Sequence, residues 1–237
     1  MGAPQQVLAS LGVGFTPPDA GTMYGWYRGD LGVTISTGVS AWANQSGTAP
    51  TLAEGTGANQ PTFSSSLINS QPGMTFDGSN DRLSVGSLSY SQPQHMFMVF
   101  RQKAWSSNGV VLSFDAANDI EPMNMPASGS TPQVGLRQRG DLSCFASPTI
   151  NTAFLFQTFV SSSSSFTALN DGAAIQTPSP VANSDTLTQI CLGAKSSSSN
   201  TQNTNFDICE LAIYPAQITG ANLTNLLNYF KARYALW

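Results

Sequence analysis

Charge is scarce in this chain. Lys, Arg, Asp and Glu together make up 9% of the 237 residues, against roughly a quarter in ordinary globular proteins. The nine Lys and Arg residues are scattered along the sequence, and the net charge is −4. Because a phosphate backbone or an anionic lipid surface is bound by several converging cations, we expect no nucleic acid and no membrane as partner. The polar surface must come from Ser, Thr, Asn, Gln and Gly, which suits strands and loops better than exposed helices.

Long hydrophobic runs and targeting signals are also missing. No apolar stretch approaches the ~18 residues that a membrane helix needs. The start, "MGAPQQVLASLGVGF", has no Lys or Arg before its apolar part, and Gln6 stands where the N-myristoylation pattern requires Ser or Thr. We therefore expect no signal peptide and synthesis in a cytoplasm. A role outside the cell would then require lysis, a non-classical route or incorporation into a particle.

Cysteine and histidine are too few for a disulfide framework or a zinc-type metal site. The three cysteines, Cys144, Cys191 and Cys209, cannot all pair with one another. Cys191 and Cys209 lie in apolar, strand-like runs, which favours buried free thiols. His95 is the only histidine, so we expect no metal site and no cofactor.

What the sequence does contain is a series of short β-branched or aromatic runs separated by Gly, Asn, Asp, Ser and Pro. Their number and spacing predict a β-sandwich, in one domain over residues 23–237. Residues 1–22 include "TPPD" at 16–19, which opposes helix, and we interpret them as an N-terminal extended arm. Such an arm either docks on a neighbouring molecule or is a disordered terminus.

The spacing of apolar residues changes at the end of the chain. Apolar side chains recur there at helical spacing: Leu223, Leu226, Leu227, Phe230 and Tyr234. This pattern predicts one amphipathic helix over 219–235, with Thr219 as its N-cap. The helix either lies on the sandwich or binds a partner.

Three segments together carry a resemblance. They are "AWANQSG" at 41–47, "QPGMTFDGSNDRL" at 71–83 and "FDICELAIYPAQITGANLTNLLNYFKARYAL" at 206–236. In this order they resemble the concanavalin A-like lectin/glucanase superfamily, in its laminin-G-like jelly-roll branch. The resemblance implies an all-β fold, a two-sheet antiparallel jelly-roll sandwich with one C-terminal amphipathic helix.

The segment "FDGSNDRL" concentrates three charged residues within a turn. We expect Phe76 and Leu83 to point into the core and Asp81 to accept backbone N–H bonds that fasten the turn. The alternative is a Ca²⁺ site using Asp77, Asn80 and Asp81, since laminin-G-like domains can hold Ca²⁺ at a loop rim. Ca²⁺ takes about six or more oxygen ligands, which makes this alternative the less favoured one.

The superfamily that this sequence resembles includes glucanases, which use two carboxyl groups about 5 Å apart on one strand face. This sequence has only three glutamates, Glu54, Glu121 and Glu210. Asp207 and Glu210 are three residues apart, so a regular strand would send them to opposite faces. His95 has no nucleophile motif beside it. We therefore predict that the protein is not an enzyme and has no catalytic residues.

A carbohydrate-binding site needs an aromatic surface beside amide and hydroxyl groups. Trp105 lies in a short polar loop with Ser107 and Asn108, which makes these three residues the predicted carbohydrate-binding site. The alternative is that Trp105 folds over the edge of the sandwich. Trp26 and Trp42 match positions that the resemblance places in the core.

The remaining interpretation is structural. A lone jelly roll with an arm, few charges and no secretion signal resembles components of bacteriophage particles. It suggests a virion surface protein, either capsid decoration, fibre or tail, that forms a homo-oligomer. Its arm would contact other virion proteins and its loops would face host-surface glycans. The alternatives are a free lectin-like, carbohydrate-binding module and a glycoside hydrolase. This step rests on analogy between families.

Overall fold

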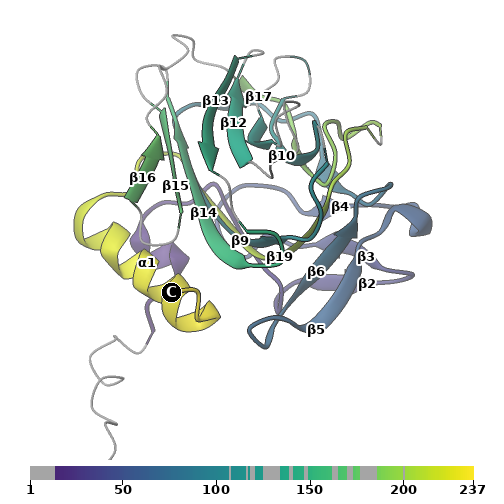
Figure 1. Cartoon of the computed structure of the whole chain (residues 1–237), viewed down its shortest axis with the longest axis horizontal. Helices are drawn as coiled ribbons and strands as arrows, with labels where there is room; N and C mark the ends of the chain where they lie inside the picture. Colours follow the sequence, from purple (N-terminus) through teal and green to yellow (C-terminus); the bar gives the residue numbers. More distant parts are fainter. Residues whose placement is uncertain are drawn as a thin grey trace, which may run out of the picture.

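The computed structural model describes most of the chain from Gly14 to Trp237 (Figure 1). The described residues are 14–106, 108–115, 117, 121–124, 134–138, 141–146, 149–161, 165–169, 173–176, 186–199 and 201–237. No helix in these ranges is both long and apolar enough to cross a membrane.

Two antiparallel sheets make up most of the described chain. The first has the strand order β16-β15-β14-β9-β19-β6-β5, and β1 also pairs with β19. Its strands are β1 (Gly25–Arg28), β5 (Thr62–Ile68), β6 (Gln71–Asp77), β9 (Gln94–Gln102), β14 (Ala153–Val160), β15 (Ser165–Leu169), β16 (Ala173–Gln176) and β19 (Asn205–Tyr214). Strands distant in sequence are neighbours in this sheet, so its formation depends on long-range contacts.

The second sheet has the strand order β13-β12-β11-β10-β18-β7-β4-β3-β2. Its strands are β2 (Val33–Ile35), β3 (Val39–Trp42), β4 (Leu52–Ala53), β7 (Leu83–Val85), β10 (Val110–Ser113), β11 (Glu121–Asn124), β12 (Val134–Gln138), β13 (Asp141–Ala146) and β18 (Ile190–Leu192). The connection between β9 and β10 therefore crosses from one sheet to the other.

Four short elements and one helix complete the described fold. They are η1 (Pro17–Ala20), η2 (Gly57–Asn59), the pair β8 (Tyr90–Ser91) and β17 (Thr186–Leu187), and α1 (Gly220–Tyr234). The architecture confirms the predicted all-β, two-sheet antiparallel jelly-roll sandwich with one C-terminal helix. Thr219 occupies the N-cap position with extended backbone, but its side chain accepts no capping hydrogen bond among the described residues.

Two apolar layers form the core. One lies between the sheets, and the other lies between the first sheet and α1. Strand β9 contributes side chains to both layers. Met96 and Met98 belong to the inter-sheet layer, and Phe97 and Val99 belong to the layer under the helix. This alternation is the period of two that a strand imposes on its side chains, and it explains why "HMFMVF" is apolar without a break.

The expected core positions are confirmed. Trp42, Phe76 and Leu83 are fully buried in the inter-sheet layer, and Trp26 is 8% exposed under the helix. Cys191 and Cys209 are buried free thiols, and burial raises the pKa of each to about 12. Both cysteines therefore act as small apolar side chains. The side chain of Cys144 lies outside the described residues.

A buried carboxylate joins the helix to the first sheet. Glu210 on β19 is fully buried and accepts hydrogen bonds from the Trp26 indole at 2.6 Å and the Tyr234 hydroxyl at 2.6 Å. The Tyr229 hydroxyl donates to the same carboxylate at 3.0 Å. Burial raises the pKa of Glu210, while these donors and the nearby Arg233 oppose the rise. Three neutral donors thus replace the water that the carboxylate loses on folding.

The N-terminal segment is partly folded onto the same chain. Pro17–Ala20 forms η1, which lies beside α1 (Figure 1). The Tyr214 hydroxyl donates to the Pro17 carbonyl at 2.8 Å, and the Asn222 amide donates to the Ala20 carbonyl at 2.9 Å. Residues 17–20, which the sequence placed in the arm, are therefore part of the domain. Residues 1–13 of the predicted arm lie outside the described part.

Replacing Tyr234 by Phe tests the role of Glu210. Tyr234→Phe removes one donor from a buried carboxylate, so we expect the free energy of unfolding to fall by about 2–3 kcal/mol. Tyr214→Phe is the matched control, because it removes a buried hydroxyl bonded to a neutral carbonyl and should cost about 1 kcal/mol. Urea unfolding of both variants measures the difference. An equal or smaller loss for Tyr234→Phe contradicts the assignment.

Candidate functional site

The predicted Trp105 site lies on the loop that crosses between the two sheets. The backbone N–H groups of Lys103 and Ala104 donate to the Asn205 carbonyl at 3.1 and 3.4 Å, and Gly109 N–H donates to the Ser106 carbonyl at 3.0 Å. Asn108 adopts φ of 60°, the left-handed conformation that Asn tolerates in a turn. The loop is thus fastened to the start of β19.

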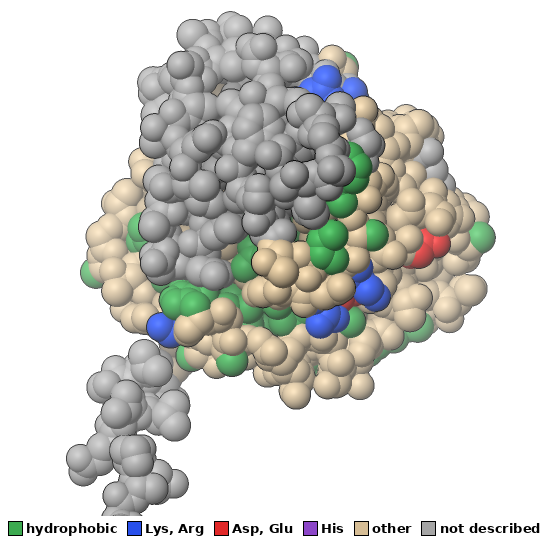
Figure 2. Space-filling model, viewed as in Figure 1, with side chains coloured by type: hydrophobic (Ala, Val, Ile, Leu, Met, Phe, Trp, Pro, Cys, Tyr) green, Lys and Arg blue, Asp and Glu red, His purple; other side chains and the backbone are tan. Residues whose placement is uncertain are grey.

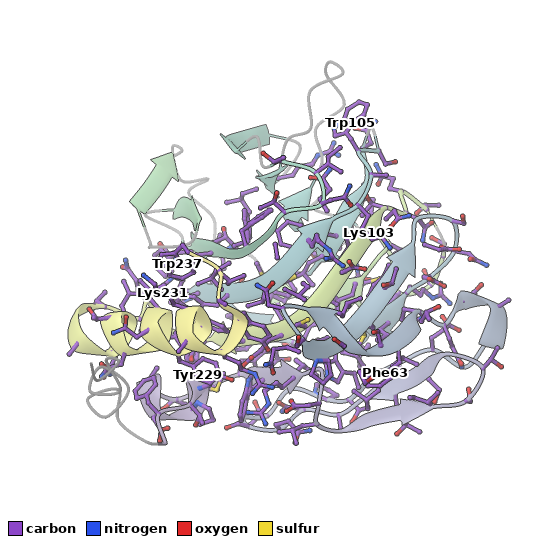
Figure 3. All side chains as sticks on the ribbon, turned by 60° about the horizontal axis from the view of Figure 1, so that its bottom comes forward. Phe63, Lys103, Trp105, Tyr229, Lys231 and Trp237 are labelled. Carbon is purple, nitrogen blue, oxygen red and sulfur yellow. The ribbon has the colours of Figure 1, made fainter. Side chains whose placement is uncertain are left out.

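Trp105 is packed against the inter-sheet core. Its side chain is partly buried against that layer, and its indole nitrogen is shielded from solvent with no hydrogen-bond partner among the described residues. Figure 3 shows Trp105 at the far end of the sandwich from Trp237 and α1. A sugar ring stacks on an open aromatic face, so this packing favours the alternative that Trp105 covers the edge. Asn108 shares the loop, and Ser107 lies outside the described residues.

The "FDGSNDRL" turn is fastened as predicted. Asp81 accepts the Asp77 N–H at 2.9 Å, and Asp77 accepts the N–H groups of Ser79 and Asn80 at 2.8 and 3.3 Å. Arg82 pairs with Glu54 at 2.5 Å. Burial raises the pKa of Asp81 to about 6, and the neighbouring Asp77 adds to the rise, while the Asp77 N–H opposes it.

The oxygen atoms of this turn are largely committed to the chain itself. The Asn80 side-chain amide donates to the Ala58 carbonyl at 2.9 Å. In the described ranges, no three His, Cys, Asp or Glu side chains converge as metal ligands. Asp77, Asn80 and Asp81 therefore fit the role of turn fasteners better than that of a Ca²⁺ cage.

Asp207 and Glu210 do share a face of β19, contrary to the sequence-based expectation. The register slips between Ile208 and Glu210, so Asp207 lies opposite Arg101 and Glu210 lies opposite Val99. This bulge inserts one extra residue and sends both carboxylates to the helix side of the sheet. Sequence alone gives no sign of the bulge.

Both carboxylates are nonetheless engaged separately. The Arg101 guanidinium donates to Asp207 at 2.7 Å, and the Thr75 hydroxyl donates to the same carboxylate at 2.5 Å. Glu210 is held by the aromatic donors described above. Each carboxylate thus has its own set of structural partners.

His95 is poorly suited to proton transfer. The side chain is fully buried, and its Nδ1 accepts the Ile218 N–H at 3.0 Å. Burial lowers the pKa of His95 to about 3, so the ring is neutral at pH 7. This arrangement fixes the start of β9 to the segment before α1.

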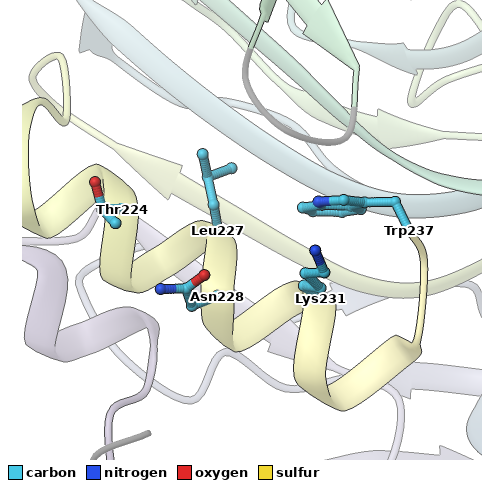
Figure 4. Close-up of a pocket in the computed structure, with 5 residues that line it drawn as sticks. All are labelled: Thr224, Leu227, Asn228, Lys231 and Trp237. Carbon is cyan, nitrogen blue, oxygen red and sulfur yellow. The ribbon is translucent and has the colours of Figure 1, made fainter. Parts of the chain in front are cut away.

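A hollow of about 230 Å³ lies along α1 (Figure 4). Its lining residues come from the helix and the last residue of the sequence: Thr224, Leu227, Asn228, Lys231 and Trp237. The Lys231 ammonium lies 5.6 Å from the centroid of the Trp237 ring. This cation–π contact uses one face of the indole.

Several buried polar side chains at the other end of β9 were not predicted from the sequence. Tyr90, Gln92 and Gln94 have side-chain polar atoms that are shielded from solvent and unpartnered among the described residues. Tyr90 stacks on Tyr24, with ring centroids 3.7 Å apart and planes 10° apart. One signal was available: Gln94 has the same strand parity as Met96 and Met98, which placed an amide on a core-facing position.

The described part of the face in Figure 2 carries few charged side chains. Uncharged polar side chains and backbone dominate it, as the composition predicts. A surface of this kind offers hydrogen bonds without a strong electrostatic field.

The fold is similar to several solved carbohydrate-active and toxin proteins. Domain 4 of AbnA, a GH43 extracellular arabinanase from Geobacillus stearothermophilus in complex with arabinotriose, matches with a TM-score of 0.61 and 10% identity, over 87% of this chain and 98% of that one. The binding domain of Paraclostridial Mosquitocidal Protein 1 matches with a TM-score of 0.63 and 11% identity, over 91% of this chain and 53% of that one. Trypanosoma rangeli sialidase matches with a TM-score of 0.61 and 9% identity, over 90% of this chain and 33% of that one.

No protein-family model matches this chain, and no curated protein matches its sequence. At identities near 10%, the structural likeness establishes a shared β-sandwich fold.

Asp81 gives the turn a pH-dependent contribution to stability. A carboxyl whose pKa is raised on folding stabilises the fold below its unfolded pKa of 3.8, and this contribution is lost as pH rises through about 6. Asp81→Asn keeps an oxygen for the Asp77 N–H and removes the titration. From pH 3.5 to pH 7 we expect the variant to gain about 1–2 kcal/mol relative to the wild type, since solvent screens part of the effect.

Urea unfolding across that pH range measures this gain. Asp77→Asn is the control, since removing the neighbouring charge should lower the pKa of Asp81 and shift the transition to lower pH. Identical pH profiles for the wild type and Asp81→Asn contradict the raised pKa.

Proposed function

We propose that this chain is a non-enzymatic, carbohydrate-binding β-sandwich module. The observation that carries the proposal is the likeness to arabinanase domain 4, a domain seen with arabinotriose, over 98% of that domain's length. The match spans a complete domain, so the comparison concerns a unit of the same extent as this sandwich. The proposed ligand class comes from this comparison and from the chemistry of the surface.

The chemistry of the chain suits hydroxyl-rich ligands. Charged residues make up only 9% of the sequence, and Ser, Thr, Asn and Gln supply the polar surface in their place. Amide groups donate and accept at once, and hydroxyls do the same, so both match the vicinal hydroxyls of a sugar. The likeness to a lectin-like, concanavalin A-type jelly roll in the sequence motifs points to the same class.

The partners of the described carboxylates support a binding role over catalysis. Glycoside hydrolysis needs two carboxyl groups that both face the scissile bond. Glu54 pairs with Arg82, Asp207 with Arg101, and Glu210 with buried aromatic donors. Each of these groups already performs a structural role, and removing it from that role would cost stability.

A position on a bacteriophage particle is the narrower form of this proposal. Its support is the composition and the N-terminal segment, both of which come from the sequence. The module would then present its glycan site at the particle surface, as capsid decoration, fibre or tail component. Neighbouring reading frames that encode capsid or tail proteins would support this position, and frames for cell-wall polysaccharide degradation would contradict it.

Binding without hydrolysis is the central prediction. On an array of neutral and acidic oligosaccharides that includes arabinan fragments, we expect the full chain to retain at least one neutral glycan. Incubation with that glycan should release no new reducing ends. Retention of no glycan at the highest soluble concentration contradicts the binding role, and release of reducing ends contradicts the non-enzymatic one.

Removal of residues 1–13 tests the arm. This truncation leaves η1 and its contacts with Tyr214 and Asn222 in place. If the segment contacts a neighbouring molecule, the truncated protein should elute as a smaller species in size-exclusion chromatography with light scattering, with an unchanged unfolding midpoint. An unchanged mass for both forms removes the segment's role in assembly.

A further inference from the structure

Three side chains at alternate positions of one segment carry five polar atoms that are buried and unpartnered in the described part of the chain. These are the Tyr90 hydroxyl and both polar atoms of the amides of Gln92 and Gln94. None of the five has a hydrogen-bond partner among the described residues. We call Tyr90, Gln92 and Gln94 the amide–tyrosine cluster.

The local fold directs this cluster to one end of the sandwich. Tyr90 on β8 pairs with Leu187 on β17, packs against the inter-sheet core and stacks on Tyr24. Gln94 begins β9 on the face that carries Met96, and it is 2% exposed. Tyr90 and Gln92 as whole residues are only partly buried. The cluster therefore lies just below the surface, where β8 borders the inter-sheet layer.

An arrangement of this kind is costly unless something fills it. A buried polar atom without a partner costs about 1–3 kcal/mol, and folded proteins leave few such atoms. Glu210 is a buried polar group that the chain itself satisfies, since three donors surround it. No donor or acceptor of the described residues reaches the cluster, so a ligand can supply its partners.

The surroundings of the cluster determine what those partners can be. The described residues that pair or stack with this segment, Tyr24, Val160, Thr186 and Leu187, are uncharged. His95 follows Gln94 on β9; it packs on the helix side against Phe97 and is neutral at pH 7 because burial lowers its pKa. A charged ligand would lose its hydration without gaining a counter-charge, so a neutral one is favoured.

We propose that the amide–tyrosine cluster is the binding site for a neutral, polyhydroxylated unit of a glycan. This inference rests on the proposed function and assigns its site and ligand class. Each glutamine amide donates to one sugar hydroxyl and accepts from the next, and the Tyr90 hydroxyl does either. Movement of the partly exposed Gln92 side chain opens the cluster to the ligand.

The test replaces the amides by leucine of similar size. Gln92→Leu and Gln94→Leu remove the unpartnered atoms and keep the volume, so without ligand each variant should unfold at the same urea concentration as the wild type or a higher one. Isothermal titration with the neutral glycan found on the array should show affinity reduced by about tenfold or more in each. Tyr90→Phe, a smaller change that keeps the ring stack, should weaken binding by about threefold to tenfold.

Trp105→Phe and Trp105→Ala are the matched controls. Trp105 follows the opposite end of β9, roughly 25 Å away by strand geometry. We expect these changes to leave affinity for the glycan unchanged.

The outcomes separate the two proposals. Glycan binding that survives the changes at Tyr90, Gln92 and Gln94 but is lost in Trp105→Ala overturns this site and leaves the proposed function in place. Glutamine variants with raised stability and unchanged affinity show that the cluster holds ordered water only, which also overturns the site. Failure of the wild type to bind any glycan overturns the proposed function and this inference with it. Stronger binding of acidic than neutral glycans contradicts the ligand class alone.

Discussion

The buried carboxylate of Glu210 connects the three parts of the outer layer. It accepts hydrogen bonds from Trp26 on β1 and from Tyr229 and Tyr234 on α1, while it belongs to β19 at the centre of the first sheet. A carboxylate without donors at this position would be strongly destabilising, so β1 and α1 must both be in place when β19 is covered. One side chain therefore couples the helix, an edge strand and the central strand.

Other charged side chains of the molecule also form structural contacts. Arg82 with Glu54 and Arg101 with Asp207 each join segments far apart in sequence, at distances of 2.5 Å. This chain has few ionisable side chains, and each such ion pair occupies two of them. Few charged side chains therefore remain for catalysis or ligand binding. This is the physical basis for assigning recognition to amides, hydroxyls and aromatic rings.

The sequence predicts the parts of the fold that are periodic and local. The strand-like apolar runs, the turn at Asp81 and the helical spacing of Leu226, Phe230 and Tyr234 all appear as expected. The sequence does not predict contacts between residues that are far apart along the chain, or irregularities in strand register. The Trp26–Glu210 bond spans 184 residues, and the bulge at β19 reverses the expected side of Glu210 because one extra residue shifts the strand parity. Trp105 was chosen as an aromatic residue in a polar loop, yet the loop crosses between sheets and turns its ring onto the core.

Glu210 and Gln94 are both buried polar side chains, but their hydrogen-bond partners differ. Both lie at buried positions of the central strands, and both would be costly without partners. Glu210 is supplied with donors from β1 and α1, whereas Gln94, Gln92 and Tyr90 have none among the described residues. A sandwich gains nothing in stability from such a group, because leucine at Gln94 would fill the same volume without desolvating an amide. We therefore propose that these amides serve a ligand, and the uncharged residues that pair or stack with their segment favour an uncharged, hydroxyl-bearing one.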